Sequence, residues 1–170
     1  MTFTCSCCGQ EHEGLADLVF AAPYYYYTVP PDQRQERCLL TSDLCSIDGK
    51  DFFIRGCLDI PIVGRPEKFS WGAWCSVSRA NFDKYREVFD QPQQAHVGPF
   101  FGWFSVRLPG YPPTLELKVM AHLRDERTRP LLELQESAHP LSQDYRFGIS
   151  EKRLQEIYEA NLHAGDRAPD

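Results

Sequence analysis

The sequence has no excess of basic residues and no long hydrophobic run. Lys and Arg total 18 against 24 Asp and Glu, so the formal net charge is −6. A protein that binds the phosphate backbone of nucleic acids needs the opposite balance, and we therefore expect no nucleic-acid partner. No apolar stretch reaches the length of a membrane-spanning helix, so we expect no membrane partner.

Signatures of common enzyme classes are also absent. The sequence contains no G-x-S-x-G, no phosphate-binding loop, no dinucleotide-binding fingerprint and no H-E-x-x-H. Residues 1–5 show no basic segment followed by an apolar one, which predicts no secretory signal and a cytoplasmic location. In that reducing compartment the 7 cysteines are not expected to form a disulfide framework.

The length and composition are those of one folded domain. The chain has 170 residues, of which 42% are hydrophobic and 13% aromatic, enough for a core of its own. We expect a single globular domain over residues 1–163. Residues 164–170 are small, polar or Pro and are expected to form a flexible tail.

Short segments separated by Gly and Pro predict antiparallel strands joined by turns. Segment 115–123 is the clearest, because Leu117, Val119 and Ala121 alternate with Lys118 and His122. This period of two is typical of a half-buried strand. Further strands are predicted at 38–47, 52–60, 69–77, 100–108 and 131–135.

Two segments have helical periodicity. Ser78 is placed to cap a helix over 79–89, and Ser150 to cap a second over 151–163. A short helical turn is expected at 31–37, and the four tyrosines 24–27 are expected to lie in an extended segment. The predicted fold class is therefore α+β, with a single antiparallel β-sheet, two principal helices (79–89 and 151–163) and an N-terminal CxxC zinc knuckle.

The most specific chemical signal is a cysteine pair in segment 1–15. Cys5 and Cys8 have the C-x-x-C spacing that aims two thiolates at one tetrahedral zinc, and Gly9 allows the turn beneath them. His12 and Cys45 are the candidate further ligands. Four protein ligands would make a closed, structural site, whereas three ligands and an open position would suit catalysis. The alternative is that these cysteines are plain thiols.

The choice of Cys45 depends on the surroundings of the other cysteines. Cys45 lies in a polar stretch near a strand end, which suits a ligand. Cys38, Cys57 and Cys75 stand singly and are expected to be small core residues. Cys7 is expected to play no part in the site.

A second group of residues indicates a functional pocket. Asp43 and Arg55 belong to a charged cluster, and Arg55 would pair with a carboxylate or bind an anion. Trp74 and Trp103 lie in neighbouring predicted strands beside glycines, so they would wall a pocket or pack in the core. His139 ends a polar loop and is a candidate base.

Blocks of the sequence such as Cys5-x-x-Cys8-Gly9-x-x-His12 and Trp71-Gly72-x-Trp74 resemble an uncharacterised bacterial family, domain of unknown function 2199. The resemblance runs from residue 5 to about residue 153 and implies a single bacterial domain with Cys5, Cys8, His12 and Cys45 as motif positions. It implies no established activity. The matching blocks are Cys5-x-x-Cys8-Gly9-x-x-His12, Ser42-Asp43-x-Cys45, Phe52-Phe53-Ile54-Arg55-Gly56, Trp71-Gly72-x-Trp74, Phe101-Gly102-Trp103, Leu108-Pro109-x-Tyr111-Pro112 and His139-Pro140-Leu141.

Together these observations favour a non-enzymatic protein over an enzyme. We expect a protein-interaction module with a structural zinc ion, and one version is an immunity-type protein that neutralises a toxin by charge complementarity. The alternative is a metal-assisted hydrolase with zinc at Cys5, Cys8 and Cys45.

Overall fold

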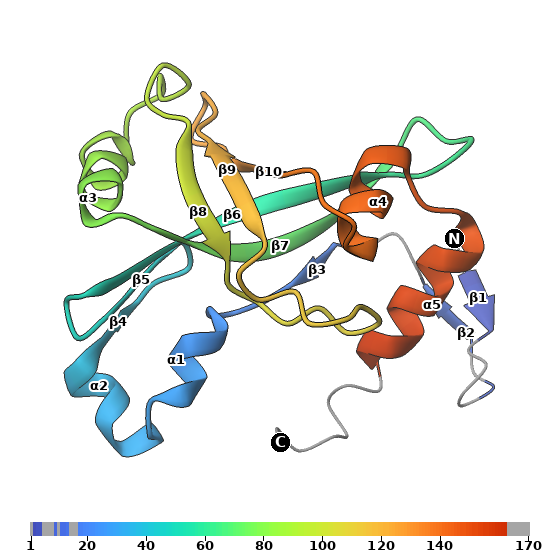
Figure 1. Cartoon of the computed structure of the whole chain (residues 1–170), viewed down its shortest axis with the longest axis horizontal. Helices are drawn as coiled ribbons and strands as arrows, with labels where there is room; N and C mark the ends of the chain where they lie inside the picture. Colours follow the sequence, from blue (N-terminus) through green and yellow to red (C-terminus); the bar gives the residue numbers. More distant parts are fainter. Residues whose placement is uncertain (1, 5–8, 10, 14–16, 163–170) are drawn as a thin grey trace.

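Five strands close into a β-barrel at the centre of the molecule (Figure 1). This computed structural model describes residues 2–4, 9, 11–13 and 17–162. Neighbouring barrel strands run antiparallel, and the last closes the barrel by a parallel pairing with the first. The barrel strands are β6 (Asp51–Pro61), β7 (Lys68–Val77), β8 (Phe100–Phe104), β9 (Lys118–His122) and β10 (Leu131–Leu134).

The predicted single antiparallel sheet with two principal helices was wrong. The sheet has 8 strands, and it curls until β6 pairs with both β7 and β10. Strand β10 on β6, and β3 (Leu18–Val19) on β7, are parallel pairings. An alternation of apolar and polar residues is the same in an open sheet and in a barrel, so the sequence pattern does not reveal closure.

Strands β6 and β7 form a long hairpin that extends beyond the barrel. Their register runs from Phe52 opposite Val77 to Pro61 opposite Lys68. The extra length carries β5 (Leu44–Ile47), which pairs with β6, and β4 (Cys38–Leu40), which pairs with β5. The strand predicted over 38–47 is thus a hairpin, because the Thr41 hydroxyl accepts from the backbone N–H of Leu44 at 2.9 Å and forms a turn.

The core takes side chains from every barrel strand. Leu58, Cys75, Phe104, Val119 and Leu132, one from each of the five strands, are fully buried. Cys75 is therefore a core residue, as predicted, whereas Cys38 and Cys57 are half-buried. The segment that leads into the first helix covers the other face of β7, where the Trp74 indole N–H donates to the Phe20 carbonyl at 2.8 Å.

The two segments predicted as helices are helical, as two of the five helices in the described residues. The first, α3 (Arg79–Val88), begins where the Ser78 hydroxyl accepts from the Asn81 N–H at 3.2 Å. The second, α5 (Glu151–Leu162), packs the Tyr158 ring edge-on against Phe69 of β7, with centroids 5.6 Å apart.

Three short helices accompany them. Helix α2 (Arg34–Arg37), with the 3-10 turn at Pro31–Gln33, confirms the turn expected at 31–37. Helix α1 (Tyr24–Thr28) replaces the predicted extended tyrosine segment, and α4 (Pro140–Phe147) was not predicted. Across the described ranges, no helix combines the length and apolarity needed to cross a membrane.

The amino-terminal strands β1 (Thr2–Thr4) and β2 (Glu11–Glu13) pair only with each other among the described strands. In Figure 1 they lie beside α5, at the opposite end of the view from β5. Cys5 and Cys8 of the predicted zinc knuckle lie outside the described residues, as does the tail 164–170.

Candidate functional site

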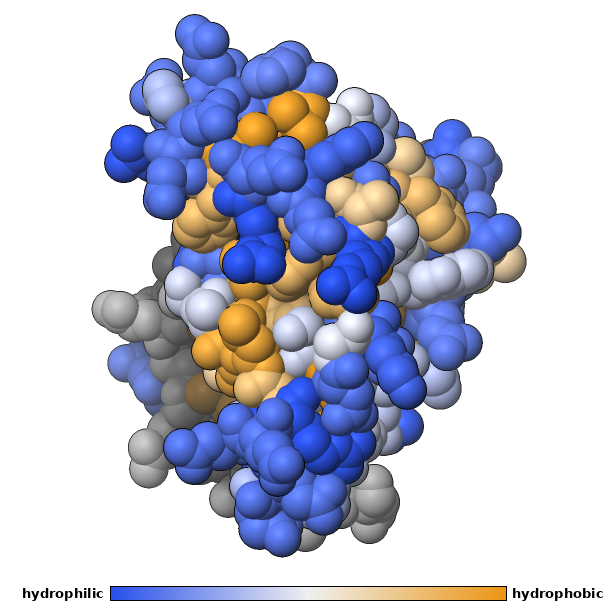
Figure 2. All heavy atoms as spheres, turned by 90° about the vertical axis from the view of Figure 1, so that its left-hand side faces the viewer, coloured by the Kyte–Doolittle hydropathy of each residue, from blue (hydrophilic) through white to orange (hydrophobic). Residues whose placement is uncertain are grey.

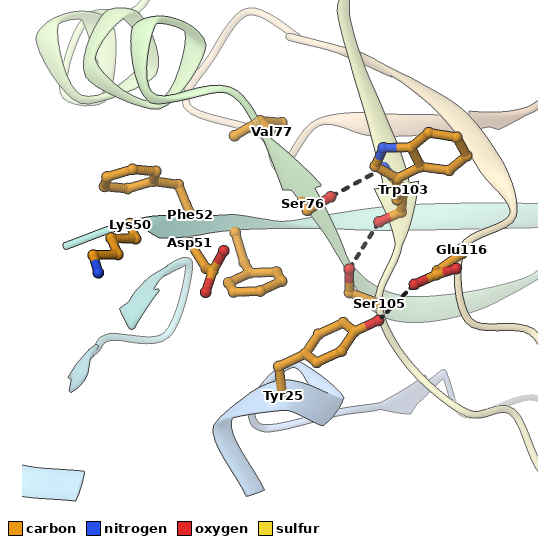
Figure 3. Close-up of a pocket in the computed structure, with 10 residues that line it drawn as sticks. Tyr25, Lys50, Asp51, Phe52, Ser76, Val77, Trp103, Ser105 and Glu116 are labelled. Atoms are coloured by element: carbon orange, nitrogen blue, oxygen red, sulfur yellow. Dashed lines mark hydrogen bonds between the residues drawn. The ribbon is translucent and has the colours of Figure 1, made fainter. Parts of the chain in front are cut away.

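A cavity of about 570 Å³ opens between the end of the long hairpin, α1 and β8, and we call it the aromatic groove. Figure 3 shows its residues, which include four aromatic rings and two carboxylates. The lining consists of Tyr25, Lys50, Asp51, Phe52, Phe53, Ser76, Val77, Trp103, Ser105 and Glu116.

Strand pairing explains why these residues meet. Because β6 begins where β7 ends, Phe53 lies directly opposite Ser76. Strand β8 then pairs with the same end of β7, which sets Trp103 opposite Ser76. Helix α1 adds Tyr25, whose ring stacks on Phe53 with centroids 5.8 Å apart and an interplanar angle of 24°.

The polar groups of the groove are held in place. The Tyr25 hydroxyl donates to Glu116 Oε1 at 3.3 Å, and burial together with the Glu116 charge raises the pKa of Tyr25. Glu116 has a positive φ of 65°, and its backbone N–H donates to the Phe104 carbonyl at 2.8 Å. In Figure 3 the Lys50 ammonium lies at the edge of the group and points away from Trp103.

One wall of the groove is an exposed aromatic surface. The Trp103 side chain is 42% exposed, and Phe101 packs edge-on against it with centroids 5.2 Å apart. On the face seen in Figure 2, apolar surface lies between two mostly hydrophilic lobes. Aromatic rings beside carboxylates suit the binding of a cationic group.

The sequence-predicted pocket residues lie in three places. Asp43 and Arg55 are adjacent, since the Arg55 N–H donates to the Asp43 carbonyl at 2.9 Å. Trp74 lies opposite Arg55 in the β6–β7 register and is fully buried. Trp103 lines the aromatic groove, where it is separate from the other four.

His139 caps α4. Its Nδ1 accepts from the Leu141 N–H at 3.1 Å, and its Nε2 lies 3.2 Å from the Pro113 carbonyl oxygen. Both ring nitrogens therefore have backbone partners, which is a structural role for this side chain.

The groove also contains residues that sequence reasoning missed, above all Tyr25 and Glu116. Tyr25 belongs to the run of four tyrosines, which was expected to form an extended segment. Glu116 follows the alternation of the predicted strand 115–123, but it lies in the loop before β9. The run of tyrosines was a usable signal, whereas nothing in the pattern marked Glu116.

Of the predicted metal ligands, the structure describes the side chain of Cys45 alone. Cys45 is fully buried in β5, and burial raises the pKa of its thiol to about 12, so it is protonated at neutral pH. The backbone of His12 pairs with Phe3 in the amino-terminal strand pair. Within the described ranges no three His, Cys, Asp or Glu side chains gather as a metal site. A site that includes Cys5 and Cys8 stays a prediction.

The comparisons with known proteins give a family and no activity. No curated protein matches the chain, and no solved structure matches it. Since a sequence model of the family covers residues 4–149, the chain belongs to the bacterial family described as "Uncharacterized protein conserved in bacteria (DUF2199)".

Proposed function

We propose that this protein is a protein-interaction module that binds a cationic side chain of a partner in the aromatic groove. The observation that carries the proposal is the exposed Trp103 ring in a groove that also presents Asp51 and Glu116. A guanidinium over an aromatic face gains about 0.5–2 kcal/mol, and more when a carboxylate shares the site.

The type of surface supports a protein partner. Trp, Tyr and Phe are enriched in the buried centres of protein interfaces and contribute much of the binding energy there. Here Tyr25, Trp103 and the adjacent Phe101 combine that composition with partial exposure.

Charge supports a basic partner. The groove lining has one positively charged side chain, Lys50, and two negatively charged ones, Asp51 and Glu116. The whole chain has a formal net charge of −6. A negative field accelerates the encounter with a basic protein and disfavours acidic ones.

A short peptide with one arginine tests the proposal, and the same peptide with citrulline is its matched control. The arginine peptide is expected to bind saturably with a dissociation constant of about 1 mM or tighter, and citrulline is expected to weaken binding because it lacks the charge. Trp103→Ala and Glu116→Gln are each expected to weaken binding roughly fivefold or more. The readout is a titration followed by amide chemical shifts in NMR spectra, which does not depend on the tryptophan that Trp103→Ala removes.

Two variants remove similar groups elsewhere. Phe147→Ala removes a ring that is 69% exposed on α4, and Glu67→Gln removes an exposed carboxylate. Both are expected to bind the arginine peptide like the wild type. Equal binding of the citrulline peptide, or equal losses in all four variants, would contradict the proposal.

The narrower proposal is an immunity-type role, in which the partner is a toxin with a basic surface. Its support is the negative charge of the chain and the acidic, aromatic groove. Co-expression with a toxin encoded beside the gene should restore growth, and the Trp103→Ala variant should lose that protection. Protection that is unchanged by Trp103→Ala would separate the immunity role from the groove.

A structural zinc ion is a second, independent proposal, supported by the C-x-x-C spacing of Cys5 and Cys8 with His12 nearby. Metal analysis of the purified protein should find near-stoichiometric zinc that Cys5→Ser and Cys8→Ser remove. Cys45→Ala is an informative third variant, because a buried, protonated thiol must lose its proton to bind zinc. Zinc retained in Cys45→Ala would assign the site to the amino-terminal segment, and zinc-free wild-type protein would end the proposal.

The metal-assisted hydrolase has no such support in the described residues. Both ring nitrogens of His139 have backbone partners, and the Asp43 carboxylate accepts from Arg129 and Ser42. We therefore keep binding as the proposed function.

A further inference from the structure

A second, smaller cavity of about 240 Å³ lies beside α3. Its lining includes Asp43, Tyr85, Arg127 and Arg129, and we call it the arginine pocket. Phe89 forms an apolar wall, and its ring packs edge-on against Tyr85 with centroids 5.4 Å apart. This cavity shares no lining residue with the aromatic groove.

The arginine side chains of the pocket have donors to spare. Arg129 Nε donates to Asp43 Oδ1 at 2.5 Å, while its two terminal nitrogens have no hydrogen-bond partner among the described residues. Arg127 is exposed and forms no ion pair within the described part of the chain. The other Asp43 oxygen accepts from the Ser42 hydroxyl at 2.5 Å, so this carboxylate is already bonded on both sides.

A third guanidinium lies behind Asp43. Arg55 is only 9% exposed, and its Nη1 donates to the Ser42 carbonyl at 3.1 Å. Its buried Nε has no hydrogen-bond partner in the described structure. Burial, and after it the nearby charge of Arg129, lowers the pKa of Arg55, while the charge of Asp43 acts in the opposite direction. The cavity lining carries two guanidinium groups, of Arg127 and Arg129, and two carboxylates, of Asp43 and of the exposed Asp90, and Arg55 adds a third guanidinium behind Asp43.

The Tyr85 hydroxyl adds a further donor to the pocket. Tyr85 is only 3% exposed, it lines the cavity, and its hydroxyl has no hydrogen-bond partner among the described residues. Among the described residues the buried atoms without a partner are Arg55 Nε and Trp71 Nε1, so the Tyr85 oxygen is open to the cavity and free to donate to a ligand there. A hydroxyl beside two arginines favours an acceptor that carries negative charge.

We propose that the arginine pocket binds the phosphate group of a small phosphate monoester. The donors are the terminal nitrogens of Arg129, the Arg127 guanidinium and the Tyr85 hydroxyl, which together match the three free oxygens of such a group. Phe89 contacts the organic part of the ligand. The three guanidinium groups exceed the carboxylates of Asp43 and Asp90 by one charge, which favours an anionic ligand.

Titrations of the whole protein at constant ionic strength test this inference, with inorganic phosphate, phenyl phosphate and acetate as probes. Binding is followed by amide chemical shifts in NMR spectra. Phosphate and phenyl phosphate are expected to bind saturably at one site, with phenyl phosphate tighter because its ring contacts Phe89. Acetate is expected to bind at least fivefold more weakly, because it has two oxygens and one charge.

Conservative variants identify the site. Tyr85→Phe removes only the hydroxyl and is expected to weaken phosphate binding roughly tenfold. Arg127→Gln removes an exposed charge and is expected to weaken it roughly threefold or more. Arg86→Gln, which removes an exposed charge on another face of α3, is the matched control and is expected to change little. Thermal unfolding of each variant shows whether it is folded.

Three results would overturn the inference. One is the absence of saturable phosphate binding, and another is acetate binding as tight as phosphate. The third is an equal loss in Arg86→Gln and in Tyr85→Phe, since that would indicate general attraction to positive charge. These results concern a different cavity and leave the proposal for the aromatic groove unaffected.

Discussion

Gly102→Ala is expected to lower the free energy of unfolding by about 4 kcal/mol or more. A Cβ atom at position 102 would lie 2.1 Å from the backbone carbonyl oxygen of Ser76. That oxygen belongs to β7, which is held along its length by β6 and cannot shift without breaking the pairing of Trp103 with Ser76. The substitution therefore acts on the close contact between the neighbouring barrel strands β7 and β8.

Urea unfolding followed by circular dichroism measures this effect. Gly64→Ala is the matched control, because Gly64 has a positive φ of 80° with no atom near the added Cβ. That control is expected to cost only about 1–2 kcal/mol, from backbone strain alone. A Gly102→Ala variant as stable as Gly64→Ala would mean that β7 and β8 do not approach each other this closely.

Asp43→Asn is expected to lower the free energy of unfolding by about 2 kcal/mol at pH 7. The substitution keeps the size of the side chain but removes the negative charge that faces Arg55 and Arg129. Two guanidiniums, one of them 9% exposed, would then lie close together with no carboxylate between them. The partial exposure of Arg129 reduces the cost below that of a fully buried pair.

The pH dependence of this effect has a definite sign. Burial alone would raise the pKa of Asp43, but hydrogen bonds from Arg129 and Ser42 outweigh it and lower the pKa. Because the pKa of Asp43 is lowered in the folded state, its charged carboxylate stabilises the protein fully at pH values above the unfolded pKa of about 3.9. This stabilisation is lost as the pH falls from there through the lower folded-state pKa. The difference between wild type and Asp43→Asn should therefore be full at pH 7 and shrink below pH of about 4.

Asp83→Asn is the matched control, since Asp83 forms an exposed ion pair with Arg79 at 3.9 Å. Exposed pairs contribute about 0–1 kcal/mol, so this variant should be close to wild type. Equal stability losses in Asp43→Asn and Asp83→Asn, or a loss that does not depend on pH, would contradict the role given to Asp43.

The local structure of this chain was largely predictable, whereas the closure of its sheet into a barrel was not. The apolar residues of 52–60 and 69–77 predict strands that the structure contains as β6 and β7, and Ser78 marks the start of α3. Barrel closure depends on β10 reaching back to β6 at Leu131 and Cys57. That single parallel pairing joins segments distant in sequence, and no local pattern encodes it.

The site was predictable only in part for the same reason. Asp43 and Arg55 face each other across the β5–β6 hairpin, at the end away from its turn, and their closeness follows from the shortness of that hairpin. Trp103 and Tyr25 meet in the groove because two distant elements flank the same end of β7, which a scan along the chain does not show. His139 caps α4, which needs the same polar loop position as a candidate base, and its role as a base stays a prediction.

The central claim is that a cationic side chain binds against Trp103, and the indole N–H signals of the three tryptophans test it most directly. Trp71 and Trp74 are fully buried, whereas Trp103 is 42% exposed in the aromatic groove. Trp103→Phe assigns its signal by removing it. The arginine peptide should shift the Trp103 signal in a saturable way while the citrulline peptide leaves it in place. A Trp103 signal that stays unchanged by the arginine peptide, or that moves equally with citrulline, would contradict the account.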